Sequence, residues 1–170
     1  MPDSIDNQLV AEVARELVLQ LASQELPLFR ANSEAYFKNP DKALAEQKGK
    51  DDMLGFGSGE VVVLLTPIAL SVVTEVVKFI VEEVKKSAKD ESSALISHTV
   101  KKVFKKFRPE EKKKDHDKKA DEKKTPPALT PDQLERVRDM ALKKARQLKL
   151  SEARAKLLAD AVIGSLVVDA

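Results

Sequence analysis

The sequence predicts an all-α protein: a small helical bundle around a central apolar helix at about residues 67–89, plus a C-terminal αα-hairpin on a charged linker. Three observations predict this class. The one long apolar run of the chain covers residues 61–84. Elsewhere, apolar residues recur at steps of three and four, the period of an amphipathic helix. Residues 108–129 contain almost no apolar side chains, so they have nothing to bury and are predicted to be a linker.

The central helix has a predicted start and a predicted polar stripe. Thr66-Pro67 has the form of an N-cap followed by the residue best tolerated in a first helical turn. A short helix from Ser58 to Leu65 is expected before it, with a kink at this dipeptide. Polar residues then follow at helical steps, on one stripe that we expect to face water: Ser71, Glu75, Lys78 and Glu82. The residues expected to be buried are Val72, Val76, Phe79, Ile80 and Val84.

The N-terminal region is predicted to form helices that end at prolines. Apolar residues at helical steps predict a helix over residues 4–24, capped by Ser4. Pro27 is expected to end it, and a short helix is expected to open at Asn32 or Ser33 and to stop before Pro40. Another short, exposed helical segment is expected over residues 41–48. The local aromatic residues are expected to pack onto a neighbouring element: Phe29, Tyr36 and Phe37.

A basic amphipathic helix is predicted over residues 94–107. Its lysines, Lys101, Lys102, Lys105 and Lys106, lie between apolar residues that include Phe104 and Phe107. Two interpretations are open. The apolar face packs into the bundle, or the lysines and phenylalanines together contact an anionic membrane surface or a partner.

The C-terminal hairpin is predicted over residues 130–168, separate from a bundle domain over residues 1–107. Thr130 and Gln133 form a capping-box pattern at its start, and Ser151 is placed to cap its second helix. A unit of this size without metal or disulfide is marginally stable alone, so we expect it to dock on the bundle, a second copy or a partner. The residues of the expected docking face are Leu134, Val137, Leu148, Leu157, Leu158, Val162 and Leu166.

Residue types that carry catalysis or bind metals are scarce. The sequence has no Cys, and its two histidines, His98 and His116, belong to no HExxH or Glu-x-x-His pattern. The glycine-rich stretch 49–60 lacks the GK[ST] of a phosphate-binding loop and is expected to form a tight turn. Glu75 and Lys78 are expected to lie on an exposed stripe. We therefore predict no enzymatic activity, no cofactor and no metal.

Charge is distributed unevenly along the chain. Residues 1–60 have a net charge of −5, from 6 basic and 11 acidic residues, and residues 61–129 have a net charge of +5, from 16 and 11. The basic stretch 101–124 holds 6 acidic residues among its 12 basic ones. This mixture argues against nucleic-acid binding, because a surface that follows phosphates carries cations without carboxylates between them.

The sequence thus predicts a non-enzymatic helical interaction module, an adaptor or scaffold, whose tethered hairpin binds a protein partner or self-associates. The alternative is a membrane-associated or membrane-inserting protein that uses the apolar segment 61–84 and the basic helix 94–107. Residues 1–8 lack the pattern of a signal peptide, and the absence of Cys fits a reducing compartment, so we expect a cytoplasmic location. In the membrane alternative, the basic C-terminal flank of the apolar segment faces the cytoplasm.

Overall fold

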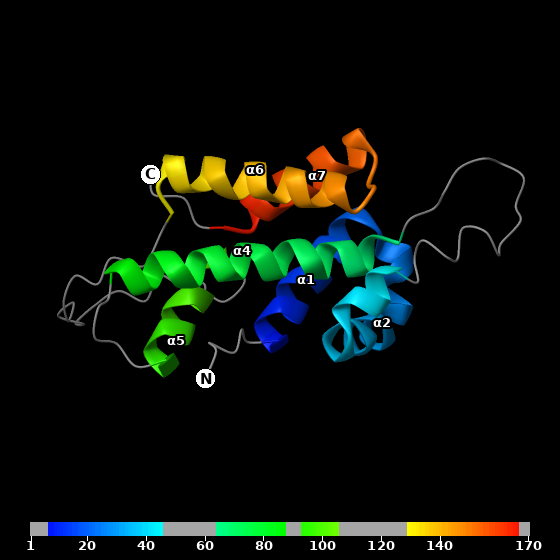
Figure 1. Ribbon diagram of the computed structural model, residues 1–170, viewed down its shortest axis with the longest axis horizontal. Coiled ribbons are helices and arrows are strands. Elements are labelled where there is room, and N and C mark those ends of the chain that lie inside the picture. Colours follow the sequence, from blue (N-terminus) through cyan, green and yellow to red (C-terminus); the bar gives the residue numbers. More distant parts are fainter. Residues whose placement is uncertain (1–6, 46–63, 88–92, 106–128, 167–170) are drawn as a thin grey trace, which may run out of the picture.

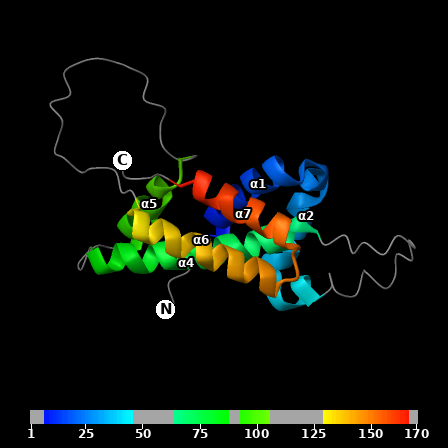
Figure 2. The ribbon, with the colours of Figure 1, turned by 90° about the horizontal axis from the view of Figure 1, so that it is seen from above.

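The central apolar segment forms α4 (Leu65–Ser87), a helix of 23 residues on which the other helices pack. The computed structural model describes residues 7–45, 64–87, 93–105 and 129–166. Within these residues every regular element is a helix, which confirms the predicted all-α class. Four helices contact α4 (Figure 1): α1 (Asn7–Leu21), α2 (Leu26–Lys38), α5 (Ser93–Val103) and α6 (Pro131–Gln147). The last helix, α7 (Glu152–Gly164), lies against α6 and α1 (Figure 2).

The junction between α1 and α2 differs from the predicted one. A single turn of 3-10 helix, η1 (Ser23–Glu25), joins them, and α2 begins at Leu26 rather than at Asn32 or Ser33. Pro27 lies in the first turn of α2 and does not end a helix, because a proline there gives up no intrahelical hydrogen bond. The N-terminal helix begins at Asn7, and Ser4 lies outside the described residues.

The aromatic residues of α2 pack as predicted. Phe29 and Tyr36 are buried, and the half-buried Phe37 packs against the same core. The rings of Tyr36 and Phe37 meet edge to face, with their centroids 5.6 Å apart. Residues 40–45 are also helical, and their half-buried Ala43 and Leu44 contact the core.

The predicted start of the central helix is wrong. α4 begins at Leu65, so Thr66 lies inside the first turn instead of capping it. Thr66 is fully buried, and its hydroxyl donates a hydrogen bond to Glu25 instead of accepting one from its own helix. Residues 58–63 of the expected preceding helix and the glycine-rich stretch 49–60 lie outside the described residues.

The predicted polar stripe of α4 holds only in the C-terminal half of the helix. Lys78 and Glu82 are exposed and Glu75 is half-buried, but Ser71 is buried with 4% of its surface exposed. All residues from Leu65 to Val73 are buried, because neighbouring helices surround this half of α4. Of the predicted core residues, Val72, Val76 and Ile80 are buried, whereas Phe79 and Val84 are half-buried.

Helices α6 and α7 start at the predicted caps. Thr130 and Gln133 form the capping box, with both of its hydrogen bonds present, and the Ser151 side chain accepts a hydrogen bond from the backbone N–H of Arg154. Lys149 adopts a φ of 70° in the turn between the helices. This turn lets α6 and α7 run in opposite directions, side by side (Figure 1 and Figure 2).

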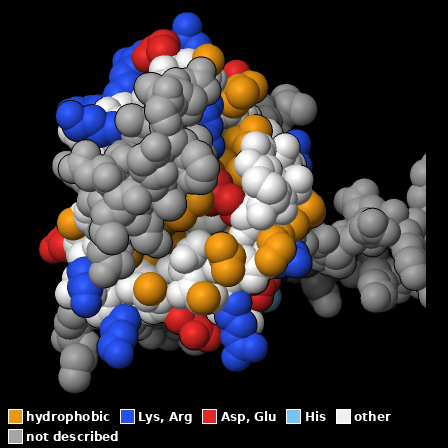
Figure 3. All heavy atoms as spheres, turned by 90° about the vertical axis from the view of Figure 1, so that its right-hand side faces the viewer, with side chains coloured by type: hydrophobic (Ala, Val, Ile, Leu, Met, Phe, Trp, Pro, Cys, Tyr) orange, Lys and Arg blue, Asp and Glu red, His pale blue; other side chains and the backbone are white. Residues whose placement is uncertain are grey.

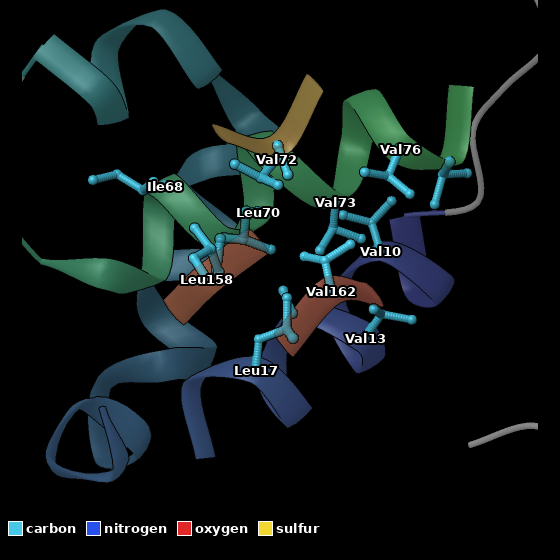
Figure 4. Packing of buried hydrophobic residues seen from close by; sticks show 14 of the residues in the cluster. Val10, Val13, Leu17, Ile68, Leu70, Val72, Val73, Val76, Leu158 and Val162 are labelled. Atoms are coloured by element: carbon cyan, nitrogen blue, oxygen red, sulfur yellow. The ribbon is translucent and has the colours of Figure 1, made fainter. Parts of the chain in front are cut away.

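The hydrophobic core is formed by residues from both ends of the chain. Leu158 and Val162 of α7 lie between residues of α1, such as Leu17, and residues of α4, such as Leu70 and Val73 (Figure 4). Residues 106–128, which hold nearly all of the predicted linker, lie outside the described residues. The division of the chain into a bundle domain, a linker and a hairpin stays a prediction.

Candidate interaction surface

The basic helix α5 keeps its apolar face inside the protein. Val100, Val103 and Phe104 are each at most 2% exposed. Phe104 therefore does not lie on a membrane-contacting or partner-contacting surface, as one interpretation of the sequence required. Among its predicted companions, Lys102 and Lys105 are exposed and Lys101 is half-buried, while Lys106 and Phe107 lie outside the described residues.

The end of α5 is attached to the end of α7. Phe104 and Leu166 form an isolated antiparallel bridge, and the backbone N–H of Lys105 donates a hydrogen bond to the carbonyl of Ser165 at 2.9 Å. Leu166, from the expected docking face, is fully buried there. This contact fixes the C-terminal end of α7 against the bundle.

The start of α6 is attached to α4 by a second polar contact. The side-chain amide of Gln133 donates a hydrogen bond to a carboxylate oxygen of Glu83 at 3.0 Å, and Lys86 donates to the other oxygen at 3.3 Å. The hydrogen bond from Gln133 is the largest cause that lowers the pKa of Glu83 below its ordinary value of 4.5. Sequence analysis missed Glu83, because its partner lies 50 residues away.

The predicted docking face of the hairpin is mostly filled by the protein's own core. Val137, Leu158, Val162 and Leu166 are buried, and Leu134 and Leu148 are half-buried. Leu157 differs from the rest of this set, because 56% of its surface is exposed. It lies on the opposite side of α7 from Leu158 and Val162, so the prediction that it faces the same surface is wrong.

A buried carboxylate holds the N-terminus of α4. Glu25 is 7% exposed and accepts hydrogen bonds from the backbone N–H of Leu65, the backbone N–H of Thr66 and the Thr66 hydroxyl, each at 2.9 Å. These are groups at the positive end of the helix dipole, where a negative charge is stabilised. All the hydrogen-bonding capacity in use at Glu25 serves the fold, which makes it a structural group.

The side of α7 that points away from the core is also apolar. Ala153, Leu157 and Gly164 are exposed and Ala161 is half-buried, at spacings of four, four and three residues. A helix that is apolar on two sides normally buries both of them. In the described residues only one side of α7 is covered, so the outward side is a candidate contact surface.

Two more exposed leucines belong to helices that adjoin α7 or α1. Leu19 of α1 is 46% exposed and Leu28 of α2 is 60% exposed. Helix α1 contacts both α2 and α7, and these helices meet toward one end of the molecule (Figure 1 and Figure 2). Viewed from that end, hydrophobic side chains appear in several places between charged ones (Figure 3). We refer to Leu19, Leu28 and Leu157 as the exposed leucines.

Ion pairs border the outward side of α7. Arg138 of α6 contacts Asp160 at 3.2 Å, and Arg146 donates hydrogen bonds to both carboxylate oxygens of Glu152, one of them at 2.9 Å. The bond with Arg146 is the main cause that lowers the pKa of Glu152, and the same bond raises the pKa of Arg146. The apolar surface is therefore flanked by fixed charges of both signs.

Groups suited to catalysis do not converge in the described part of the chain. His98 is exposed, and Lys78 lies 4.0 Å from Glu75 on the surface of α4. No cluster of acidic residues and histidines with metal-binding geometry occurs among the described residues. Within the same residues, no helix combines the length and the apolar character needed to cross a bilayer.

Comparison of the chain with protein-family models, with curated proteins and with solved structures finds no match.

Proposed function

We propose that this chain is a non-enzymatic helical interaction module, an adaptor or scaffold that binds a protein partner through its exposed leucines. One observation supports the proposal: three adjoining helices each expose about half of a leucine side chain. Exposed apolar surface bordered by polar groups is typical of protein-interaction sites. We also propose a cytoplasmic location, which the absence of Cys favours.

The strength of such contacts can be estimated from the exposed area. Full burial of a leucine side chain is worth about 1.5–3 kcal/mol relative to full exposure. Since these three leucines are about half exposed, their burial would contribute roughly 2–4 kcal/mol together. This is modest compared with the roughly 8 kcal/mol of a micromolar complex. The neighbouring charges are expected to supply specificity.

An anionic membrane is the competing partner. A surface helix that binds lipid inserts apolar side chains below its lysines. In α5 the corresponding side chains, Val103 and Phe104, are enclosed by the core instead. This arrangement supports a protein partner over a membrane.

A capture experiment with matched variants tests the proposal. The full chain, a Leu19→Ser/Leu28→Ser/Leu157→Ser variant and a Lys102→Ser/Lys105→Ser control are immobilised and exposed to the same lysate. We expect at least one protein to bind the wild type and the lysine control and to fall about ten-fold on the leucine variant, a change worth about 1.4 kcal/mol. Thermal melts establish that each variant is folded.

Two outcomes would contradict this function. Equal capture by the wild type and by the leucine variant would mean that the exposed leucines bind no partner. Flotation with vesicles that contain anionic lipid, lost in the Lys102→Ser/Lys105→Ser variant, would identify a membrane as the partner.

A further inference from the structure

The outward side of α7 has a pattern that is complementary to itself. Counted outwards from Leu157, alanines lie four residues away on each side, at Ala153 and Ala161. An arginine lies three residues before Leu157, at Arg154, and an aspartate lies three residues after it, at Asp160. The segment therefore has matching small residues and opposite charges at equal distances from its centre.

This symmetry has a geometric consequence for two antiparallel copies of α7. At 100° per residue, Ala153, Ala161, Arg154 and Asp160 all lie within about 60° of Leu157 around the helix axis. A two-fold axis through Leu157 reverses both the helix direction and its two flanks. Arg154 of one copy then lies beside Asp160 of the other, and Ala153 lies beside Ala161.

We propose that the partner at this surface is a second copy of the chain, which docks through α7 about a two-fold axis at Leu157. The inference rests on the proposed function, since it uses one of the exposed leucines. Three features favour a second copy over an unrelated protein. The charges complement each other in this register, the alanines permit close approach of the helices, and one isologous contact satisfies both copies at once.

The exposure of these residues agrees with the proposed contact. Leu157 is 56% exposed, and the Asp160 side chain is 62% exposed although it contacts Arg138 at 3.2 Å. A carboxylate can accept from more than one cation, so Asp160 retains room for Arg154 of the second copy. At Gly164, a Cβ atom would find nothing within 4 Å, so the end of this face is open.

The contact is expected to be weak. A single helix face buries less than the ~1,200 Å² of a stable interface, so we expect a dissociation constant between about 1 µM and 1 mM. Sedimentation velocity of the full chain from about 5 to 500 µM should therefore show a monomer–dimer equilibrium. Leu157→Ser and Arg154→Asp should each weaken it about ten-fold, and the double change Arg154→Asp/Asp160→Arg should restore it.

Cysteine cross-linking tests the register. The chain has no Cys, so single cysteines report on single positions. Facing Cα atoms of two helices packed 8–10 Å apart lie close enough for a disulfide, so Leu157→Cys should form a disulfide-linked dimer under mild oxidation. Leu28→Cys, which is similarly exposed but lies on α2, is the matched control and should stay monomeric.

The outcomes separate this inference from the proposed function. A monomer across the whole concentration range, or equal cross-linking at Leu157→Cys and Leu28→Cys, would overturn the dimer. If capture of another protein still depended on the exposed leucines, the interaction function would stand without the dimer. A dimer that the Arg154→Asp/Asp160→Arg change fails to restore would overturn the antiparallel register.

Discussion

Removal of the Glu25 carboxylate should destabilise the whole fold, although Glu25 is a charged residue at a helix junction. In Glu25→Ala, the backbone N–H groups of Leu65 and Thr66 and the Thr66 hydroxyl lose their acceptor. Leu65 is 2% exposed and Thr66 is 0% exposed, so bulk water does not replace the carboxylate without rearrangement. Each buried donor left without a partner costs about 1–3 kcal/mol.

We expect Glu25→Ala to lower the free energy of unfolding by about 3 kcal/mol, since part of the loss is recovered by relaxation of the helix end. For a chain of this length that corresponds to a decrease of roughly 6–12 °C in Tm. Glu25→Gln keeps one acceptor oxygen, which can serve Thr66, but it turns an amide N–H₂ group toward the N–H of Leu65. Its cost should be smaller, about 1–3 kcal/mol.

Urea unfolding followed by far-UV circular dichroism measures these changes. Glu34→Gln is the matched control, because the Glu34 side chain is 68% exposed and pairs only with the exposed Arg30. It should change stability by less than about 0.5 kcal/mol. If Glu25→Ala and Glu25→Gln both stay within 0.5 kcal/mol of the wild type at an unchanged slope, roughly the effect of a surface substitution, the carboxylate does not hold α4.

Three further predictions concern the core, the α4–α6 contact and the two sides of α7. Phe104→Ala should cost about 3–5 kcal/mol by urea unfolding, because the ring is fully buried; a cost below about 1 kcal/mol would place it outside the core. Since the pKa of Glu83 is lowered in the folded state, its contribution to stability is present above about pH 4.5 and is lost as the pH falls. Urea midpoints between pH 7 and pH 3 should therefore depend less on pH in Gln133→Ala than in the wild type, and equal pH dependence would contradict this assignment. Leu158→Ala should cost about 2–5 kcal/mol and Leu157→Ala under about 1 kcal/mol, and similar costs would mean that α7 buries both sides.

The sequence predicted those elements whose signals are local. The capping box of Thr130 and Gln133 and the cap at Ser151 were identified from spacings of three residues, and the structure contains both. The apolar face of α1 was also identified, because Val13 and Leu17 lie one helical turn apart and both pack into the core. Such signals need no knowledge of the remaining chain.

The start of α4 was missed because its cap comes from a distant part of the chain. Thr66-Pro67 has the form of a local N-cap, but Glu25, 41 positions earlier, supplies the acceptor. Once Glu25 occupies that position, Thr66 acts as a donor and the helix extends back to Leu65. No periodicity in the sequence connects two positions this far apart.

The burial of α4 was only partly predictable for a related reason. A helical wheel orders residues around an axis but does not count the neighbouring helices. Ser71 is buried because neighbours surround the N-terminal half of α4, and Phe79 is half-buried where fewer neighbours remain. The largest effect expected from a Phe→Ala change therefore moves from Phe79 to Phe104.

The candidate surface was predicted in part. Leu157 was assigned to a docking face together with Leu158, yet adjacent residues on a helix point about 100° apart. α7 is apolar on both sides, so its sequence alone does not identify which side meets the core. Leu158 and Val162 contact α1 and α4, which leaves Leu157 outward.

The attachments of the C-terminal helices bear on how well this surface would bind. The hydrogen bond from Gln133 to Glu83 holds the start of α6, and the hydrogen bond from Lys105 to Ser165 holds the end of α7. Between these two points, α7 packs on the core along its length, so Leu157 is presented from a fixed backbone. A preformed surface loses little conformational entropy on binding, and a small contact then retains more of its gross energy. Loosening either attachment should therefore weaken association at Leu157, even though neither attachment touches the partner.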